Sequence, residues 1–277
     1  MNHKEGHFKG VRGSEHYYQA WLPEGEIKAG IVIVHGLGEH SGRYDNVVNH
    51  LVPRGYAVYG FDLIGHGKSE GEREFVKSFE DYTDSLTTYL ALVKNWLPDK
   101  SVFLLGHSMG GLIATYYLLD HSDAFRGAVI SASSITVPEH FNQSTLLAAK
   151  ILSKLTPKMG LMQLDANDIS RDPEVVRVYL EDPLVFKGKT TVRLMAEMLK
   201  AMIRVNEEIS QISIPFIYVG GGADKLAFPK RAKTIYERAK SKDKTLKIYE
   251  GLSHEVFNEP ERAQVLQDVA NWLDAHI

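Results

Sequence analysis

Val102-Phe103-Leu104-Leu105-Gly106-His107-Ser108-Met109-Gly110 is the stretch that decides the fold. Its first four residues predict a strand buried on both faces, and the apolar residues after Gly110 predict a helix. A G-x-S-x-G pentapeptide at such a junction is a nucleophile elbow, in which the backbone turns sharply and lifts the serine hydroxyl clear of the sheet. Side chains at the two glycines would crowd this turn. We therefore predict that Ser108 is a catalytic nucleophile.

The composition narrows the class of protein. The chain has 277 residues, of which 44% are hydrophobic, so residues 1–277 are expected to form a single domain with a large core. The net charge is −3 without a charged block, so nucleic acid is not an expected partner. No cysteine is present, which excludes a disulfide framework, a thiolate metal site and a cysteine nucleophile.

The first residues lack the apolar core of a signal peptide. No apolar run reaches the roughly 18 residues that a membrane-spanning helix needs. We therefore expect a soluble cytoplasmic protein, with peripheral attachment to a membrane as an alternative.

Strands and helices alternate along most of the chain. Six short runs rich in β-branched and aromatic residues predict strands: Ile31–Val34, Tyr56–Phe61, Val102–Leu105, Gly127–Ile130, Pro215–Val219 and Thr245–Tyr249. Helical patterns cover Phe79–Leu97, Met109–Leu119, Pro229–Lys240 and Pro260–Ala275. This alternation predicts an α/β fold with a mostly parallel sheet and right-handed crossovers. The segment Phe8–Leu22 alternates more loosely and is expected to form an antiparallel hairpin at the sheet edge.

Residues 134–213 break this rhythm and contain no convincing strand. Apolar residues of this segment fall on helical faces, and five of the seven methionines lie within it. We predict a helical cap over the carboxyl ends of the strands. The apolar residues are then either the core of the cap or a flexible wall for an acyl chain, for which unbranched methionine is suited.

The partners of Ser108 follow from chain order. In this type of fold the order is serine, acid, histidine, and a serine hydroxyl needs such a base to become nucleophilic. His254 follows the last predicted strand, whereas its rival His276 is the penultimate residue. Asp224 follows the preceding strand, whereas its rival Asp243 precedes a strand. We therefore predict His254 as the general base and Asp224 as the acid that orients it.

An oxyanion hole requires two backbone N–H groups directed at the developing negative charge. The residue after the nucleophile, Met109, supplies one of them, and Leu37, in the glycine-rich loop after the first parallel strand, is the candidate for the second. His35 and His107 flank these motifs and are expected to pack or to form local hydrogen bonds. The predicted chemistry needs no metal and no cofactor.

With these residues in place, the chain resembles the α/β-hydrolase superfamily, and within it the monoacylglycerol lipase family (lysophospholipase-like, serine aminopeptidase S33-type hydrolases). The resemblance covers about residues 31–261 and is carried by His35–Tyr44, Asp62–Arg73, Gly106–Gly111, Ala223–Leu226 and Lys242–Gly251. It implies an eight-stranded sheet flanked by helices, with a mobile amphipathic cap after the sixth strand. It also implies hydrolysis of an acyl ester of glycerol.

The resemblance further implies that Glu39, Arg43 and Tyr179 bind the substrate at the polar end of the pocket, near the glycerol head group. The alternative is an ion pair that braces a loop, together with a tyrosine that packs in the cap. One departure lies near this end. Animal members of the family tend to carry a second histidine three residues after the catalytic one, whereas this chain has Phe257.

The expected activity is a two-step acyl transfer that converts a small lipid ester to a fatty acid and an alcohol. A lysophospholipase or a broad carboxylesterase would use the same three residues, and a non-catalytic binding protein of the same fold is an alternative from another class. The stretch Phe141–Leu155 has an apolar face with lysines 150, 154 and 158 nearby. Such a segment is expected to touch a membrane or micelle surface.

Overall fold

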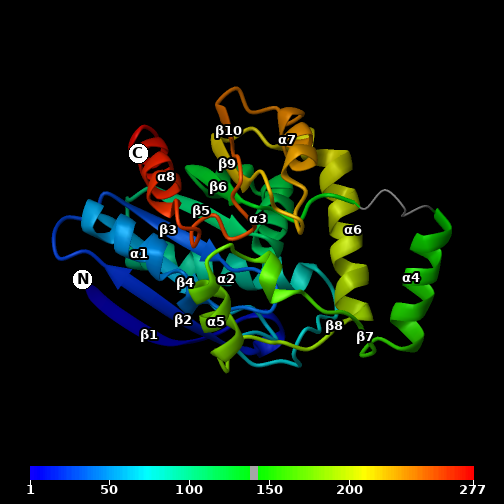
Figure 1. Ribbon diagram of the computed structural model, residues 1–277. Coiled ribbons are helices and arrows are strands. Elements are labelled where there is room, and N and C mark those ends of the chain that lie inside the picture. The colour runs from blue at the N-terminus through cyan, green and yellow to red at the C-terminus, as the bar shows by residue number, and fades with distance from the viewer. Residues whose placement is uncertain (138–142) are drawn as a thin grey trace.

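The computed structural model describes residues 1–137 and 143–277, and its centre is a twisted eight-stranded sheet (Figure 1). The strand order is β1-β2-β4-β3-β5-β6-β9-β10. The strands are β1 (Asn2–Lys9), β2 (Glu15–Leu22), β3 (Ala29–Val34), β4 (Tyr56–Phe61), β5 (Val102–His107), β6 (Gly127–Ser131), β9 (Phe216–Gly221) and β10 (Lys244–Tyr249). From β4 to β10 all neighbours pair in parallel, while β1 and β2 are antiparallel.

The six predicted strands are confirmed as the six parallel strands of this sheet. The predicted hairpin is also present, but it begins at Asn2 instead of Phe8, and Asn2 pairs with Leu22. The pattern missed the start of β1 because this strand lies at the sheet edge, where most of its side chains are exposed. Without a buried face, an edge strand lacks the alternation that marks a strand in a sequence.

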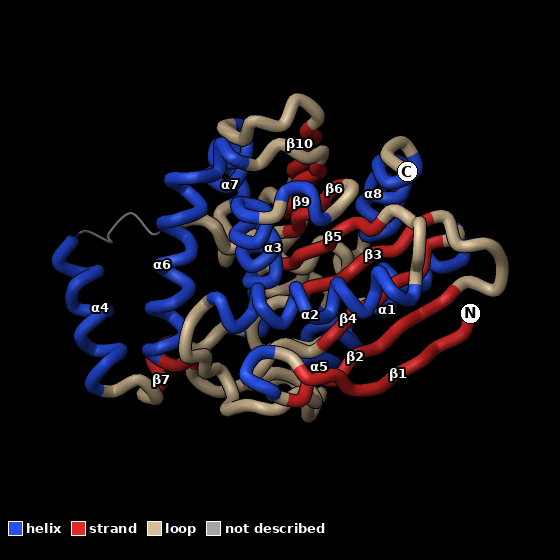
Figure 2. Tube along the Cα trace, turned by 180° about the vertical axis from the view of Figure 1, so that it is seen from behind, coloured by secondary structure: helices blue, strands red, loops and turns tan. Residues whose placement is uncertain are grey.

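Helices cover both faces of the sheet (Figures 1 and 2). On one face, α1 (Asp45–Leu51) and α8 (Arg262–Asp274) pack on Ile31, Phe103 and their neighbours. The opposite face carries α2 (Glu80–Trp96), α3 (Met109–Asp120) and α7 (Pro229–Glu237). Helix α3 is buried on nearly every side, which agrees with its uniformly apolar sequence. This burial holds the residue just before α3 firmly at the end of β5.

The segment between β6 and β9 holds α4 (Gln143–Leu155), β7 (Gly160–Met162), α5 (Pro173–Glu181), β8 (Thr190–Thr191) and α6 (Val192–Glu208). Helix α6 packs on α3, and α4 lies on the far side of α6 (Figure 1). The expectation of no strand here was wrong, because β7 and β8 form a small antiparallel pair. Strands of three and two residues are too short to show a period in the sequence.

The action of residues 134–213 as a cap stays a prediction, and Phe141 lies outside the described residues. Among those described, no helix is long and apolar enough to cross a membrane.

Candidate active site

Ser108 occupies the turn between β5 and α3, with φ of 54° and ψ of −119°. A positive φ is unusual for a residue with a side chain and is maintained only where the surroundings enforce it. A Cβ atom on Gly106 would lie 2.4 Å from the carbonyl oxygen of Gly110, and one on Gly110 would lie 2.0 Å from that of Val34. Both glycines are therefore required sterically. The amide of Ser108 donates to the Ser131 carbonyl at 2.9 Å, which ties the turn to β6.

Three side chains from separate loops meet at this turn. His254 Nε2 lies 2.8 Å from the Ser108 hydroxyl oxygen, and its Nδ1 lies 2.9 Å from Asp224 Oδ2. Asp224 follows β9 and His254 follows β10, so the sheet brings both loops to the same edge as β5. The amides of Leu226 and Ala227 donate to Asp224 Oδ1 at 2.7 and 3.1 Å, which fixes the carboxylate. All three members of the constellation are buried.

The electrostatics favour a basic imidazole. Burial lowers the pKa of His254, but the adjacent Asp224 carboxylate outweighs burial and raises the pKa above its usual range. Burial acts in the opposite direction on Asp224, yet the pairing with His254 and the two amides hold the pKa of this carboxyl below its ordinary value. Burial also lowers the pKa of His107 to about 3, so this ring, 4.9 Å from the ring of His254, is uncharged.

The two rival residues lie together elsewhere. His276 Nε2 is 2.9 Å from Asp243 Oδ2, so the alternative base and the alternative acid pair with each other. Asp243 precedes β10 and thus lies at the amino edge of the parallel strands, opposite the edge that carries His254.

The loop after β3 approaches Ser108 closely. A Cβ atom on Gly36 would lie 3.2 Å from that of Ser108. His35 braces this loop by accepting from the Leu63 amide at 2.9 Å and contacting the Gly36 carbonyl at 2.8 Å. The amides of Leu37 and Met109 have no hydrogen-bond acceptor within residues 1–137 and 143–277. They are therefore free to serve an oxyanion.

Glu39 and Arg43 lie beside this loop, and the structure brings them together with Tyr179 of α5. Arg43 Nη1 donates to Glu39 Oε2 at 2.9 Å, and its guanidinium lies 4.7 Å from the centre of the Tyr179 ring. Glu39 Oε1 accepts from the amide of Gly36 at 2.6 Å and from the hydroxyl of Tyr44 at 2.9 Å. The Glu39 carboxylate and the Arg43 guanidinium are thus paired within the protein, and direct contact of the three residues with substrate stays a prediction.

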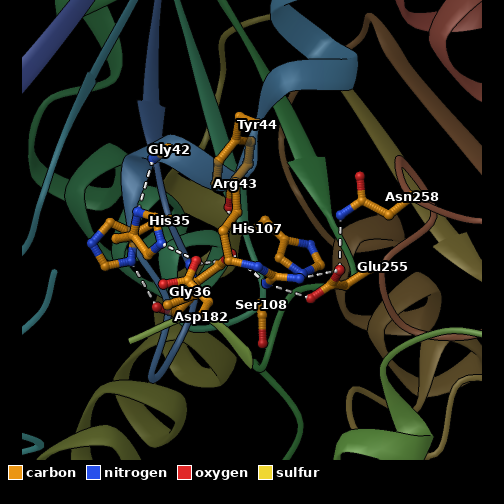
Figure 3. A network of polar contacts seen from close by, with 12 residues as sticks. His35, Gly36, Gly42, Arg43, Tyr44, His107, Ser108, Asp182, Glu255 and Asn258 are labelled. Atoms are coloured by element: carbon orange, nitrogen blue, oxygen red, sulfur yellow. Dashed lines mark hydrogen bonds and ion pairs between the residues drawn. The ribbon is translucent and has the colours of Figure 1, made fainter. Parts of the chain in front are cut away.

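A further carboxylate, that of Glu255, belongs to this group, although the sequence analysis did not single it out. Glu255 receives two hydrogen bonds from Arg43, at 2.7 and 2.9 Å, and one from the Asn258 amide at 2.8 Å (Figure 3). Glu255 immediately follows His254, and this adjacency was the one available signal. Its partner Arg43 lies 212 residues earlier, so no local pattern predicts the pairing.

A cavity of about 420 Å³ opens beside Leu37, between the loop after β3 and the segment that contains α5. Tyr179, Phe186 and Thr190 contribute to its wall. No cluster of three or more histidine, aspartate or glutamate side chains arranged to hold a metal is found in the described part of the chain.

Comparison with known proteins agrees with this geometry. The profile of the serine aminopeptidase S33 hydrolases matches residues 25–261. A monoacylglycerol lipase of Mycolicibacterium smegmatis is 34% identical over 99% of this chain and 98% of its own length. The human monoglyceride lipase is 36% identical over 96% of this chain and 89% of its own. The crystal structure of a Paleococcus ferrophilus monoacylglycerol lipase superposes with a TM-score of 0.82 at 31% identity, with full coverage of both chains.

The fold and the arrangement at the strand ends therefore define a serine hydrolase of the α/β-hydrolase superfamily. Within that superfamily, the chain belongs to the monoacylglycerol lipase family of S33-type hydrolases.

Proposed function

We propose that this protein hydrolyses the ester bond of monoacylglycerols, with Ser108 as nucleophile, His254 as general base and Asp224 as the orienting acid. The proposal rests on family membership and on one geometric observation, the continuous hydrogen-bonded path from Ser108 through His254 to Asp224. This path takes up the serine proton and stabilises the resulting imidazolium.

In the first step Ser108 attacks the ester carbonyl while His254 accepts the hydroxyl proton. The amides of Leu37 and Met109 stabilise the negative oxygen of the tetrahedral intermediate, and one such donor is worth about 3 kcal/mol. His254 then donates its proton to the departing glycerol oxygen, which leaves the acyl group on Ser108. In the second step His254 activates a water that releases the fatty acid and restores the hydroxyl.

Contact of the cap with a lipid surface belongs to the same proposal. Leu147, Ile151 and Leu155 of α4 are 59%, 49% and 74% exposed, which is unusual for large apolar side chains. Lys150 and Lys154 lie nearby, on the rim of a cavity of about 300 Å³ between α4 and α6. Lys158 instead pairs with Glu72 at 2.6 Å. An apolar face beside cations suits a helix that rests on an anionic lipid surface.

The first experiment compares fatty-acid release from 1-oleoylglycerol, oleoyl-lysophosphatidylcholine and trioleoylglycerol, with Ser108→Ala as the blank. We expect the highest kcat/KM for 1-oleoylglycerol. Preference for the lysophospholipid would retain the serine mechanism and overturn the proposed substrate. Absence of hydrolysis of all three by the wild-type protein would overturn the proposed function.

A further inference from the structure

One guanidinium lies between two buried carboxylates next to the catalytic constellation. Glu39 and Glu255 are 5% and 6% exposed, and both receive hydrogen bonds from Arg43. We call these three residues the Glu39–Arg43–Glu255 cluster. With both carboxylates ionised, the cluster carries one net negative charge.

The hydrogen-bond donors to both carboxylates favour the ionised forms. Burial raises the pKa of Glu255, but the Arg43 guanidinium outweighs burial and lowers the pKa below its ordinary value. For Glu39, burial and the neighbouring Glu255 carboxylate raise the pKa above its ordinary value, while the guanidinium, the Gly36 amide and the Tyr44 hydroxyl, which donate to its oxygens, act against this rise. Hydrogen bonds of this kind favour the charged carboxylate.

No second cation compensates this charge within the described part of the chain. Apart from Arg43, the hydrogen-bond donors to the two carboxylates are an amide, a phenol and the carboxamide of Asn258, all of them uncharged. Asn258 in turn accepts from the Asn46 side chain at 2.9 Å. His107 also lines the small cavity at the cluster and is uncharged at neutral pH, because burial lowers its pKa to about 3.

The cluster lies next to groups that act on the ester in the proposed mechanism. Glu255 is bonded directly to His254, which hands its proton to the leaving oxygen, and the chain places Glu39 two residues after Leu37. The cavity at the cluster measures about 10 Å³, room for at most one water. An alcohol therefore has no space inside this cavity, so an effect of Glu255 on it acts through charge.

We propose that Glu255 is a specificity-determining residue. Its charge makes the Glu39–Arg43–Glu255 cluster negative, and the site thereby favours esters of uncharged alcohols over esters of alcohols that carry a phosphate. This inference rests on the proposed ester hydrolysis at Ser108. The same charge favours the imidazolium that forms on His254 when the serine proton is transferred. A phosphate on the leaving alcohol is instead repelled. For unit charges about 10 Å apart and an effective dielectric constant of about 20, this repulsion corresponds to roughly tenfold in rate.

The test uses two soluble substrates that differ only in the alcohol, 1-butyrylglycerol and 1-butyrylglycerol 3-phosphate. The short acyl chain keeps both monomeric, so the charge of a micelle surface does not enter. The measured quantity is the ratio of kcat/KM for the phosphorylated substrate to kcat/KM for the uncharged one. We compare wild type with Glu255→Gln, which keeps an acceptor for Arg43 but removes the charge.

We expect Glu255→Gln to raise this ratio about tenfold, and Glu255→Asp, which keeps the charge, to retain the wild-type ratio. The matched control is Glu261→Gln, which removes a half-exposed carboxylate from the same loop, paired with Arg171. It should change the ratio less than twofold. An unchanged ratio in Glu255→Gln, with both rates lowered equally, would overturn the proposal and leave Glu255 a purely structural role. Failure of wild type to hydrolyse 1-butyrylglycerol would instead count against the proposed function.

Discussion

The loops at the carboxyl ends of the strands and the stretch from α4 to β7 differ in which side chains they bury and which they expose. In the loops, the carboxylates of Glu39 and Glu255 are buried and paired with Arg43. In the α4–β7 stretch, large apolar side chains face solvent, namely Leu147, Ile151, Leu155, Met159, Leu161 and Met162. Burial of charge and exposure of apolar surface are both unfavourable for an isolated domain. The first is offset inside the protein by hydrogen bonds, whereas the second has no such compensation within the described residues, and we propose a lipid surface as its partner.

The largest effects should come from the strand-end loops. Ser108→Ala removes the nucleophile and should lower kcat about 10⁵-fold or more. Asp224→Asn should lower kcat about 10⁴-fold, because the histidine loses the partner that sets its tautomer. Release of butyrate from 1-butyrylglycerol measures both. The matched control is Asp243→Asn, which changes the acid paired with His276 and should leave the rate within twofold. A similar loss in the control would contradict the assignment of the acid.

Truncation of an apolar side chain should lower the free energy of unfolding more in the sheet than in α4. Leu105 of β5 is fully buried, so Leu105→Ala should lower the free energy of unfolding by about 3 kcal/mol. Ile151 of α4 is half exposed, and Ile151→Ala should cost less than about 1 kcal/mol. Urea unfolding followed by circular dichroism gives both values. Equal losses would mean that α4 is packed as tightly as the sheet, contrary to its exposed apolar face.

Acidic residues on α4 should separate lipid contact from chemistry. The double variant Leu147→Glu/Ile151→Glu should lower the hydrolysis of 1-oleoylglycerol in phosphatidylglycerol vesicles about tenfold, because it removes apolar contact and adds repulsion from anionic lipid. Hydrolysis of soluble 1-butyrylglycerol should stay within twofold. Ile277→Glu, which changes an exposed apolar residue at the C-terminus, serves as the control. Equal rates of the double variant and wild type on vesicles would argue against lipid contact.

The smallest expected effect concerns pH. His254 must be neutral to act as a base, and its pKa is raised, so kcat/KM for 1-butyrylglycerol should fall as the pH drops through a value above 6.5. Glu255 contributes to this rise after Asp224. Glu255→Gln should therefore move the acid limb to lower pH. A shift to higher pH would contradict the sign of the charge assigned to the cluster.

Much of the fold followed from the sequence because its signals are local. Buried parallel strands read as short continuous apolar runs, and all six were found in this way. The elbow was recognisable because two glycines must flank a turn in which side chains collide. His254 lies within hydrogen-bond distance of both Ser108 and Asp224, as expected from the order of the three residues along the chain and from the rule that such groups follow strands at the carboxyl edge.

The rest depended on contacts that no local pattern carries. The sequence pattern did not predict the start of β1, because this strand is an exposed edge of the sheet. It did not predict the β7–β8 pair, because these strands are only a few residues long. The resemblance implied that Glu39 and Arg43 bind the substrate, with a loop-bracing ion pair as the alternative. The structure pairs the two side chains with each other, and their contact with substrate stays a prediction. Nothing near Glu255 in the chain indicates that its partner would be Arg43.

By itself, the sequence determined most of the helices and strands along the chain, the strained turn at Ser108 and the identity of its candidate partners, since steric demands and periodicity act over a few residues. Only the tertiary structure decided the charge beside the site. Arg43 and Glu255 lie 212 residues apart in the chain but meet because β3 and β10 end at the same edge of the sheet. Burial at this edge weakens the screening of the carboxylate charge that Arg43 does not balance.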